Sequence, residues 1–180
     1  RCDQSPRTPP HAAVPLVGDA RATLEELATA VGDYSTPDAY RARVLELNRA
    51  WDAEVERVYH HSVGDILTQG EVIGAVEAST DARDVVVTSA GSLPGDLHKL
   101  WRSPRPGGYH LEYGYSTMGY EVAGGRGVAL AEPGRRVHVM VGDGSWLMLS
   151  AELATAVQEG IAMTVVLLDN HGFRCIRNLS

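Results

Sequence analysis

The chain has 180 residues, 44% of them hydrophobic and 22% charged, which is enough to bury a sizeable core. Its formal net charge of -7 leaves no basic face for neutralising phosphates, so the chain does not fit a general nucleic-acid binder. Cys2 and Cys175 lack metal-ligand spacing, and no apolar run approaches the roughly 20 residues of a membrane helix. We therefore expect a cytoplasmic protein without a disulfide framework, a membrane partner or a nucleic-acid partner.

The first 60 residues predict a linker or domain tail followed by helices. Residues 1–15 are rich in proline, and residues 14–17 predict a short strand entering a turn. The pattern from Thr23 to Glu26 has the form of a capping box, which favours a helix at about 20–31. Thr36 suits the N-cap of a second helix, which we expect to end near residue 60.

An apolar stripe runs along this second helix. It is too short for the three to four heptads that would support a coiled coil, so packing against a neighbouring domain is the favoured interpretation. The stripe consists of Tyr40, Val44, Leu47, Trp51, Val55 and Val58.

From Gln69 onward, strands alternate with helices. Apolar strands are predicted at 84–88, 137–141 and 164–168, and each is followed by a loop that contains glycine. Helices are predicted at 71–78, from the loop 89–96 to residue 100, at 121–131, and between the last two strands. Three glycines weaken the helix at 121–131, and close backbone packing is the usual compensation. The fold class is therefore α/β, a doubly wound parallel sheet with its three loops at one edge.

Two of these loops carry oxygen ligands. Gly142-Asp143-Gly144-Ser145 follows one apolar strand and offers a carboxylate, while Asn170 follows the next strand and offers an amide. Ligands of open parallel sheets bind outside the carboxyl ends of the strands. A hard divalent cation takes a few protein oxygens and adds phosphate oxygens and water. Because glycines allow backbone N–H groups to approach a diphosphate, the pattern predicts a diphosphate-plus-metal site.

The spacing of these motifs resembles that of the thiamine diphosphate enzymes, in which GDG is followed by about 25 residues and then Asn. Residues 69–74, 90–101 and 109–125 further resemble the trihydroxycyclohexanedione hydrolases of myo-inositol catabolism. The resemblance extends over nearly the whole chain from Val14. The second and third stretches separate this branch from the acetolactate synthases.

The resemblance implies a role for several residues. Mg²⁺ would be bound by the Asp143 carboxylate, the Asn170 side-chain carbonyl and the Gly172 backbone carbonyl. Within the Gly142 motif, Gly144 and Ser145 would donate to the diphosphate of thiamine diphosphate, and Gly91 and Ser92 would close the same site. Met118 would wedge the bent cofactor, and the Ser116 carbonyl would accept from its pyrimidine amino group. Relatives often carry Gly at the Ser116 position.

The resemblance also implies a reaction. The protein would be a hydrolase that cleaves the ring C–C bond of trihydroxycyclohexane-1,2-dione, a small molecule, to 5-deoxy-glucuronic acid. His98, His110, Glu112 and His171 are open candidates for proton transfer, and none is assigned as catalytic.

Domain organisation follows from the same resemblance. Residues 1–60 would form the end of a middle domain and a helical linker. Residues 61–180 would form a cofactor-binding domain that is incomplete at its carboxyl end. The activating glutamate would lie outside the chain. Relatives share their sites between subunits, so we expect a dimer or tetramer. Because the chain starts with Arg1, we expect a fragment of a longer protein, inactive alone.

Three other interpretations compete with this one. The first is an acetolactate synthase-like enzyme with the same cofactor. The second is a non-catalytic, truncated cofactor-binding module retained for assembly. The third, a nucleotide-binding Rossmann domain, is weaker because no GxGxxG follows the strand at 84–88.

Overall fold

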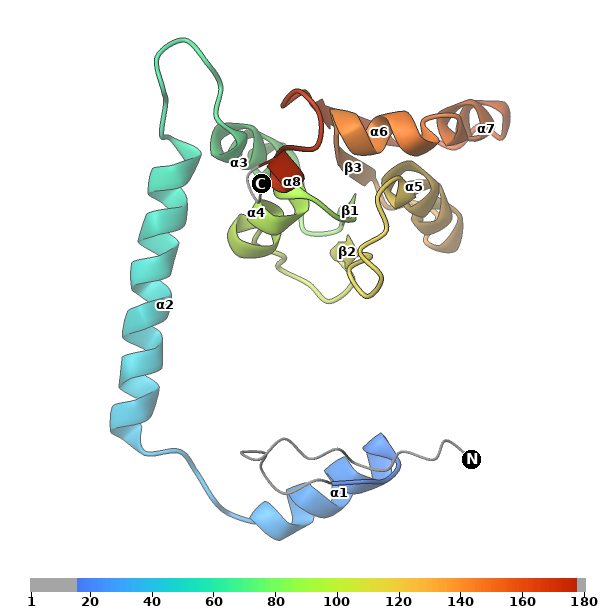
Figure 1. Cartoon of the computed structure of the whole chain (residues 1–180). Helices are drawn as coiled ribbons and strands as arrows, with labels where there is room; N and C mark the ends of the chain where they lie inside the picture. Colours follow the sequence, from blue (N-terminus) through green and yellow to red (C-terminus); the bar gives the residue numbers. More distant parts are fainter. Residues whose placement is uncertain (1–15, 178–180) are drawn as a thin grey trace. The chain divides into compact units, whose positions relative to one another are not determined.

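The computed structural model describes residues 16–177, which divide into two compact units at residues 49 and 50. The first unit holds α1 (Ala20–Val31) and the start of α2 (Asp38–Tyr59), as labelled in Figure 1. The predicted helix at 20–31 is confirmed, but its predicted capping box is wrong. The N-cap is Asp19, whose side chain accepts a hydrogen bond from the Ala22 N–H at 3.0 Å, and Thr23 lies inside the helix.

The strand predicted at 14–17 does not form where it is described. Leu16 and Val17 have no strand conformation, and residues 14 and 15 lie outside the described residues. A strand needs a partner for its backbone N–H and C=O groups. The four-stranded sheet, which belongs to the other unit, includes no strand from this segment.

The apolar stripe of α2 is buried only at its carboxyl end. Val55 is 1% exposed and Val58 packs beside the same core. Farther back along the helix, Tyr40 is 62% exposed and Leu47 is 51% exposed. Packing of the exposed part against a neighbouring domain stays a prediction.

The second unit is built on a four-stranded parallel sheet. Its strands are β1 (Val85–Thr88), β2 (Tyr109–Leu111), β3 (Val137–Gly142) and β4 (Thr164–Leu168), in the order β2-β1-β3-β4. The three predicted strands and their parallel pairing are confirmed. The sequence did not predict β2, which pairs with β1 at the edge of the sheet and has only three, half-buried residues.

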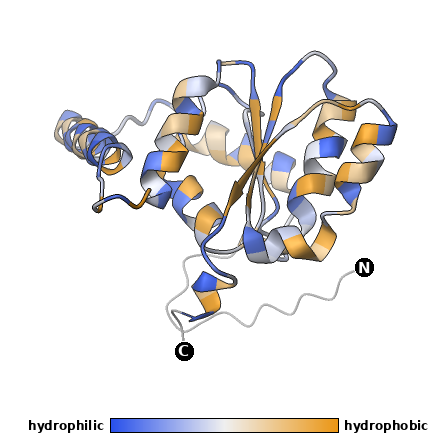
Figure 2. Cartoon of the chain, turned by 90° about the horizontal axis from the view of Figure 1, so that it is seen from above, coloured by the Kyte–Doolittle hydropathy of each residue, from blue (hydrophilic) through white to orange (hydrophobic). Residues whose placement is uncertain are grey.

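Helices cover both faces of this sheet, as Figure 2 shows from above. One face packs on the end of α2, α3 (Gln69–Ser79) and α4 (Ser92–Leu100). The other face packs on α5 (Tyr120–Ala131), α6 (Asp143–Leu149) and α7 (Glu152–Gln158). Along β1, Val86 joins the first core while Val85 and Val87 join the second, as strand alternation requires. The doubly wound α/β class is thus confirmed.

Some element boundaries differ from the prediction. α4 begins at Ser92 rather than after residue 96, because Pro94 lies in the first helical turn, where its missing N–H costs nothing. The helix between β3 and β4 is split into α6 and α7 around Ser150 and Ala151. A short helix, α8 (Arg174–Arg177), follows β4 and was not predicted.

The glycines of α5 bring the helix close to the sheet. A Cβ on Gly125 would lie 2.3 Å from Cγ2 of Val139 in β3, so only glycine permits this approach. A Cβ on Gly127, by contrast, would meet no atom within 4 Å. Close backbone packing is therefore confirmed at Gly125 and not at Gly127.

A polar cluster joins the amino ends of β1 and β3. The Asp84 carboxylate, in a residue only 6% exposed, accepts a hydrogen bond from Arg136 Nε at 3.0 Å. The Nε2 atom of His138 lies 3.1 Å from Asp84 Oδ2. Burial opposes ionisation of Asp84, but the Asp81 N–H, Arg136 and His138 outweigh it and lower its pKa.

Candidate functional site

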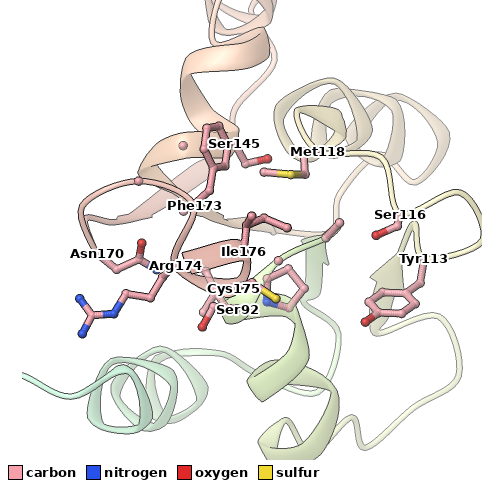
Figure 3. A pocket seen from close by; sticks show the side chains of 17 residues that line it. Ser92, Tyr113, Ser116, Met118, Ser145, Asn170, Phe173, Arg174, Cys175 and Ile176 are labelled. Carbon is pink, nitrogen blue, oxygen red and sulfur yellow. The ribbon is translucent and has the colours of Figure 1, made fainter. Parts of the chain in front are cut away.

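A cavity of about 160 Å³ lies at the carboxyl ends of the strands. Its lining comes from the segments that follow all four strands, which meet at one edge because the strands are parallel. Figure 3 shows Met118 and Ile176 pointing into this space from opposite sides. The lining includes Ala90, Gly91, Ser92, Tyr113, Ser116, Met118, Gly142, Gly144, Ser145, Asn170, Gly172, Phe173 and Cys175.

Every predicted site residue except Asp143 lines this cavity. Asp143 lies at the first position of α6, and its carboxylate contacts the loop after β4. Oδ1 accepts a hydrogen bond from the Asn170 N–H at 3.3 Å, and Oδ2 accepts one from the Gly172 N–H at 2.6 Å. The structure thus brings the predicted residues together, while their individual roles stay predictions.

The Asp143 carboxylate, the Asn170 amide and the Gly172 carbonyl, which are the predicted metal ligands, converge beside the cavity. With the Asn170 amide in one orientation, its oxygen lies 3.2 Å from Asp143 Oδ1 and 2.8 Å from the Gly172 carbonyl oxygen. Neighbouring oxygens around an octahedral magnesium ion are about 3 Å apart, so this spacing suits a hard cation. In the other orientation, the amide nitrogen occupies the same place and donates to both oxygens. The amide can therefore serve the site with or without a cation.

The charge of Asp143 is held by backbone groups. Burial opposes its ionisation, but the N–H groups of Gly172, Asn170 and Gly144 outweigh burial and lower its pKa. The ion pairs found among residues 16–177 include none with Asp143. Nor does that part of the chain contain three His, Cys, Asp or Glu side chains grouped as metal ligands. Any cation here would rest on one carboxylate, amide and carbonyl oxygens, and oxygens from a ligand.

The loop before α5 is shaped by Glu112. Its carboxylate accepts hydrogen bonds from the Tyr115 N–H at 3.0 Å and the Thr117 N–H at 2.7 Å, and these bonds lower its pKa. Ser116, between them, takes a left-handed backbone with φ 55°. Such a conformation is more natural for glycine, and here the bonds to Glu112 on either side support it. Met118 follows and lines the cavity.

None of the four open acid–base candidates lines the cavity. Glu112 shapes the loop. His110 Nε2 lies 2.6 Å from the Tyr120 hydroxyl, and the rings of these two residues stack. The His171 side chain is 84% exposed and pairs with Asp169. His98 is exposed on α4. Their surroundings favour scaffold roles, and the catalytic residues stay unassigned.

Sequence reasoning missed several residues at this site. Phe173 lies so close over Gly144 that a Cβ there would be 2.8 Å from its ring. Glu121, in the first turn of α5, is buried against Ser145. Tyr113 lies in the stretch 109–125 that carries the resemblance, whereas nothing in the sequence placed Phe173, Cys175 or Ile176 at the cavity. For Glu121, the available signal was an acidic residue in a helix of small and apolar residues.

A family profile described as "Thiamine pyrophosphate enzyme, C-terminal TPP binding domain" matches residues 89–180. This match covers half of the chain and all the residues that line the cavity. The chain belongs to the thiamine pyrophosphate enzymes. The predicted family is thereby confirmed, and the match supports thiamine diphosphate as the ligand class of this cavity.

Two bacterial proteins are similar to most of the chain. A 3D-(3,5/4)-trihydroxycyclohexane-1,2-dione hydrolase of Geobacillus thermodenitrificans is 45% identical over 190 residues, covering 93% of this chain and 29% of that protein. A protein of the same description from Bacillus cereus is 39% identical over 191 residues, covering 93% and 30%. The chain thus spans less than a third of the length of these relatives.

A solved structure supports the fold. The thiamine diphosphate-dependent 4-hydroxybenzoylformate decarboxylase of Rhodococcus jostii RHA1 matches with a TM-score of 0.61 and 24% identity, over 67% of this chain and 23% of that one. Within residues 16–177, no helix combines the length and the apolar character needed to cross a membrane.

Proposed function

We propose that this chain forms the diphosphate and metal half of the active site of a thiamine diphosphate-dependent hydrolase. Its substrate would be trihydroxycyclohexane-1,2-dione, whose ring C–C bond is cleaved to give 5-deoxy-glucuronic acid in myo-inositol degradation. The observation that carries the proposal is the convergence of the Asp143 carboxylate, the Asn170 amide and the Gly172 carbonyl beside a cavity lined by glycines and serines. The substrate is supported by the hydrolases that are 45% and 39% identical to the chain.

The residues present fit Mg²⁺ as the metal. Asp143 would contribute its carboxylate, Asn170 its amide oxygen and Gly172 its carbonyl oxygen. Diphosphate oxygens and water would supply the remaining ligands, as magnesium prefers. The lowered pKa of Asp143 keeps its carboxylate ionised at neutral pH, as this role requires.

The same residues fit the cofactor. Gly144 and Ser145 lie in the first turn of α6, where backbone N–H groups lack partners within the helix. Gly91 and Ser92 would bound the diphosphate from the loop after β1. Met118 would support the bent cofactor, and the carbonyl of Ser116 would accept from its amino group. The cofactor supplies the electron sink for C–C cleavage, while the chain binds and orients it.

The cavity is small for a whole cofactor. Ligand pockets commonly measure roughly 300–1,000 Å³, against about 160 Å³ here. We therefore propose that the other half of the site comes from a second subunit of a cytoplasmic dimer or tetramer, which would also supply the activating glutamate. In this proposal, residues 1–60 belong to a middle domain and linker, and residues 61–180 form the cofactor-binding domain.

The test uses the whole natural protein that carries this chain. With thiamine diphosphate and Mg²⁺, we expect turnover of the cyclic dione and no acetolactate from pyruvate. Acetolactate formation without dione turnover would identify a synthase-like enzyme. Cofactor binding without either activity would favour a non-catalytic module. Calorimetric titration of the cofactor with and without Mg²⁺ tests the metal, and equal affinity in the two titrations would refute it.

A further inference from the structure

Glu121 has a carboxyl group with almost no exposure to solvent and, within the described part of the chain, no cationic partner. The residue is 1% exposed, in the first turn of α5. Both of its carboxyl oxygens lie 2.8 Å from Ser145 Oγ, and Oε2 lies 3.0 Å from the Gly119 nitrogen. The ion pairs found among residues 16–177 do not involve Glu121. Burial raises its pKa, although its hydrogen bonds to backbone N–H groups and to Ser145 act against burial.

The hydrogen atoms around Ser145 can be counted. A hydroxyl has one proton to donate and two lone pairs to accept with. Ser145 Oγ already accepts from the Gly119 N–H at 2.7 Å. If Glu121 is ionised, the Ser145 proton must go to its carboxylate, and none is left for an anion in the cavity. If Glu121 keeps its proton, it can donate to Ser145 Oγ, and the Ser145 proton is free.

Electrostatics favours the second arrangement when a diphosphate is bound. A buried carboxylate without a cation is costly, and a bound diphosphate raises that cost, because one Mg²⁺ does not neutralise the diphosphate and the Asp143 carboxylate together. Ser145 lines the cavity and lies only 5% exposed, so its proton is directed by its neighbours rather than by solvent.

We propose that Glu121 is a positioning residue that donates its carboxyl proton to Ser145 Oγ and so directs the Ser145 hydroxyl proton toward the bound diphosphate. The same carboxyl group contacts the N–H of Gly119, the residue after Met118. It thereby links the segment that carries Met118 to Ser145 in α6. This inference rests on the proposed position of the diphosphate.

The decisive experiment measures the effect of Ser145→Ala in two backgrounds. Thiamine diphosphate with Mg²⁺ is titrated by calorimetry into the whole natural protein, with Glu121 or with Glu121→Gln. Glutamine imitates the protonated acid, because its NH₂ can donate to Ser145 Oγ while its carbonyl accepts from Gly119. We expect Glu121→Gln alone to change affinity less than about twofold, and Ser145→Ala to weaken it about tenfold in both backgrounds.

Other outcomes overturn the inference. If Ser145→Ala has no effect with Glu121 present but costs about tenfold with Glu121→Gln, the acid is ionised and holds the Ser145 proton. No effect in either background means that Ser145 does not touch the diphosphate. If the unmodified protein does not bind the cofactor, the proposed function fails together with the inference.

Two controls separate positioning from folding. Glu121→Leu removes the donor at similar volume, so it should weaken binding by up to about tenfold, whereas Glu121→Gln should restore the affinity. Equal losses in the two variants would indicate a packing role and overturn the inference. Glu132→Gln, the same substitution at an exposed acid after the end of α5, should leave affinity unchanged. Melting temperatures without cofactor identify any variant that fails to fold.

Discussion

Two carboxylates at opposite ends of the sheet have their negative charges stabilised in different ways. Asp84, at the amino end, is neutralised by Arg136 and lies beside His138. Asp143, at the carboxyl end, accepts hydrogen bonds from the backbone N–H groups of Asn170 and Gly172. Burial opposes both charges, and hydrogen bonds still lower both pKa values. The charge of Asp84 is thus neutralised within the chain, whereas the charge of Asp143 remains available to bind an external cation.

The largest expected effect comes from removing the negative charge of Asp143. Asp143→Asn should weaken binding of thiamine diphosphate with Mg²⁺ by about 100-fold, because the cation loses the one charged ligand that residues 16–177 offer it. Calorimetric titration of the whole natural protein measures this, with Asp84→Asn as the matched control. Should Asp143→Asn bind as tightly as the unmodified protein, the metal assignment and the contrast between the two carboxylates would both be wrong.

Asp84→Asn should produce the opposite pattern. It leaves Arg136 and His138 without their anion, so we expect a loss of about 2–3 kcal/mol in the free energy of unfolding at neutral pH. Cofactor affinity should stay within about twofold, since Asp84 lies at the far end of the sheet. Denaturant unfolding of both proteins measures the difference. A large loss of affinity with unchanged stability would contradict the structural role.

The pH dependence of this loss has a defined sign. The pKa of Asp84 is lower in the folded protein than in the unfolded chain, so its contribution is present above the unfolded value, near 4. The contribution is lost as pH falls through the lower, folded value. The stability gap between the unmodified protein and Asp84→Asn should therefore be constant near pH 7 and narrow in acid. A gap that widens in acid would refute this linkage.

The strands and the contacts at the site also differ in how far the sequence predicted them. β3 and β4 are apolar runs with glycine loops behind them, so both strands and the edge that their loops share could be predicted from local pattern. β2 could not, because its three residues gain strand structure only by pairing with β1. The Glu121–Ser145 contact joins residues 24 positions apart and depends on how two helices meet. Phe173 reaches Gly144 through a turn that no local pattern indicates.

Gly125 and Gly142 differ in how much space surrounds them. A methyl group on Gly125 would collide with Val139, so Gly125→Ala should cost about 1–3 kcal/mol of stability. A methyl group on Gly142 would meet no protein atom within 4 Å at the edge of the cavity. Gly142→Ala should therefore keep the melting temperature but weaken cofactor binding about tenfold, by occupying ligand space. If both variants lose only stability, Gly142 is a folding residue.

The smallest effect is expected at Ser116, where the proposed contact is made by the backbone. A non-glycine residue at φ 55° costs on the order of 1 kcal/mol, and glycine relieves this strain while losing a similar amount through its freer unfolded chain. Ser116→Gly should thus change stability by less than about 0.5 kcal/mol, and affinity by less than about twofold, because the carbonyl remains. Ser116→Val is the matched opposite, since a β-branched residue is poorly tolerated at positive φ. A tenfold loss of affinity in Ser116→Gly alone, measured by the same titration, would move the contact from the carbonyl to the hydroxyl. The loop before α5 would then bind the cofactor through a side chain rather than through its backbone.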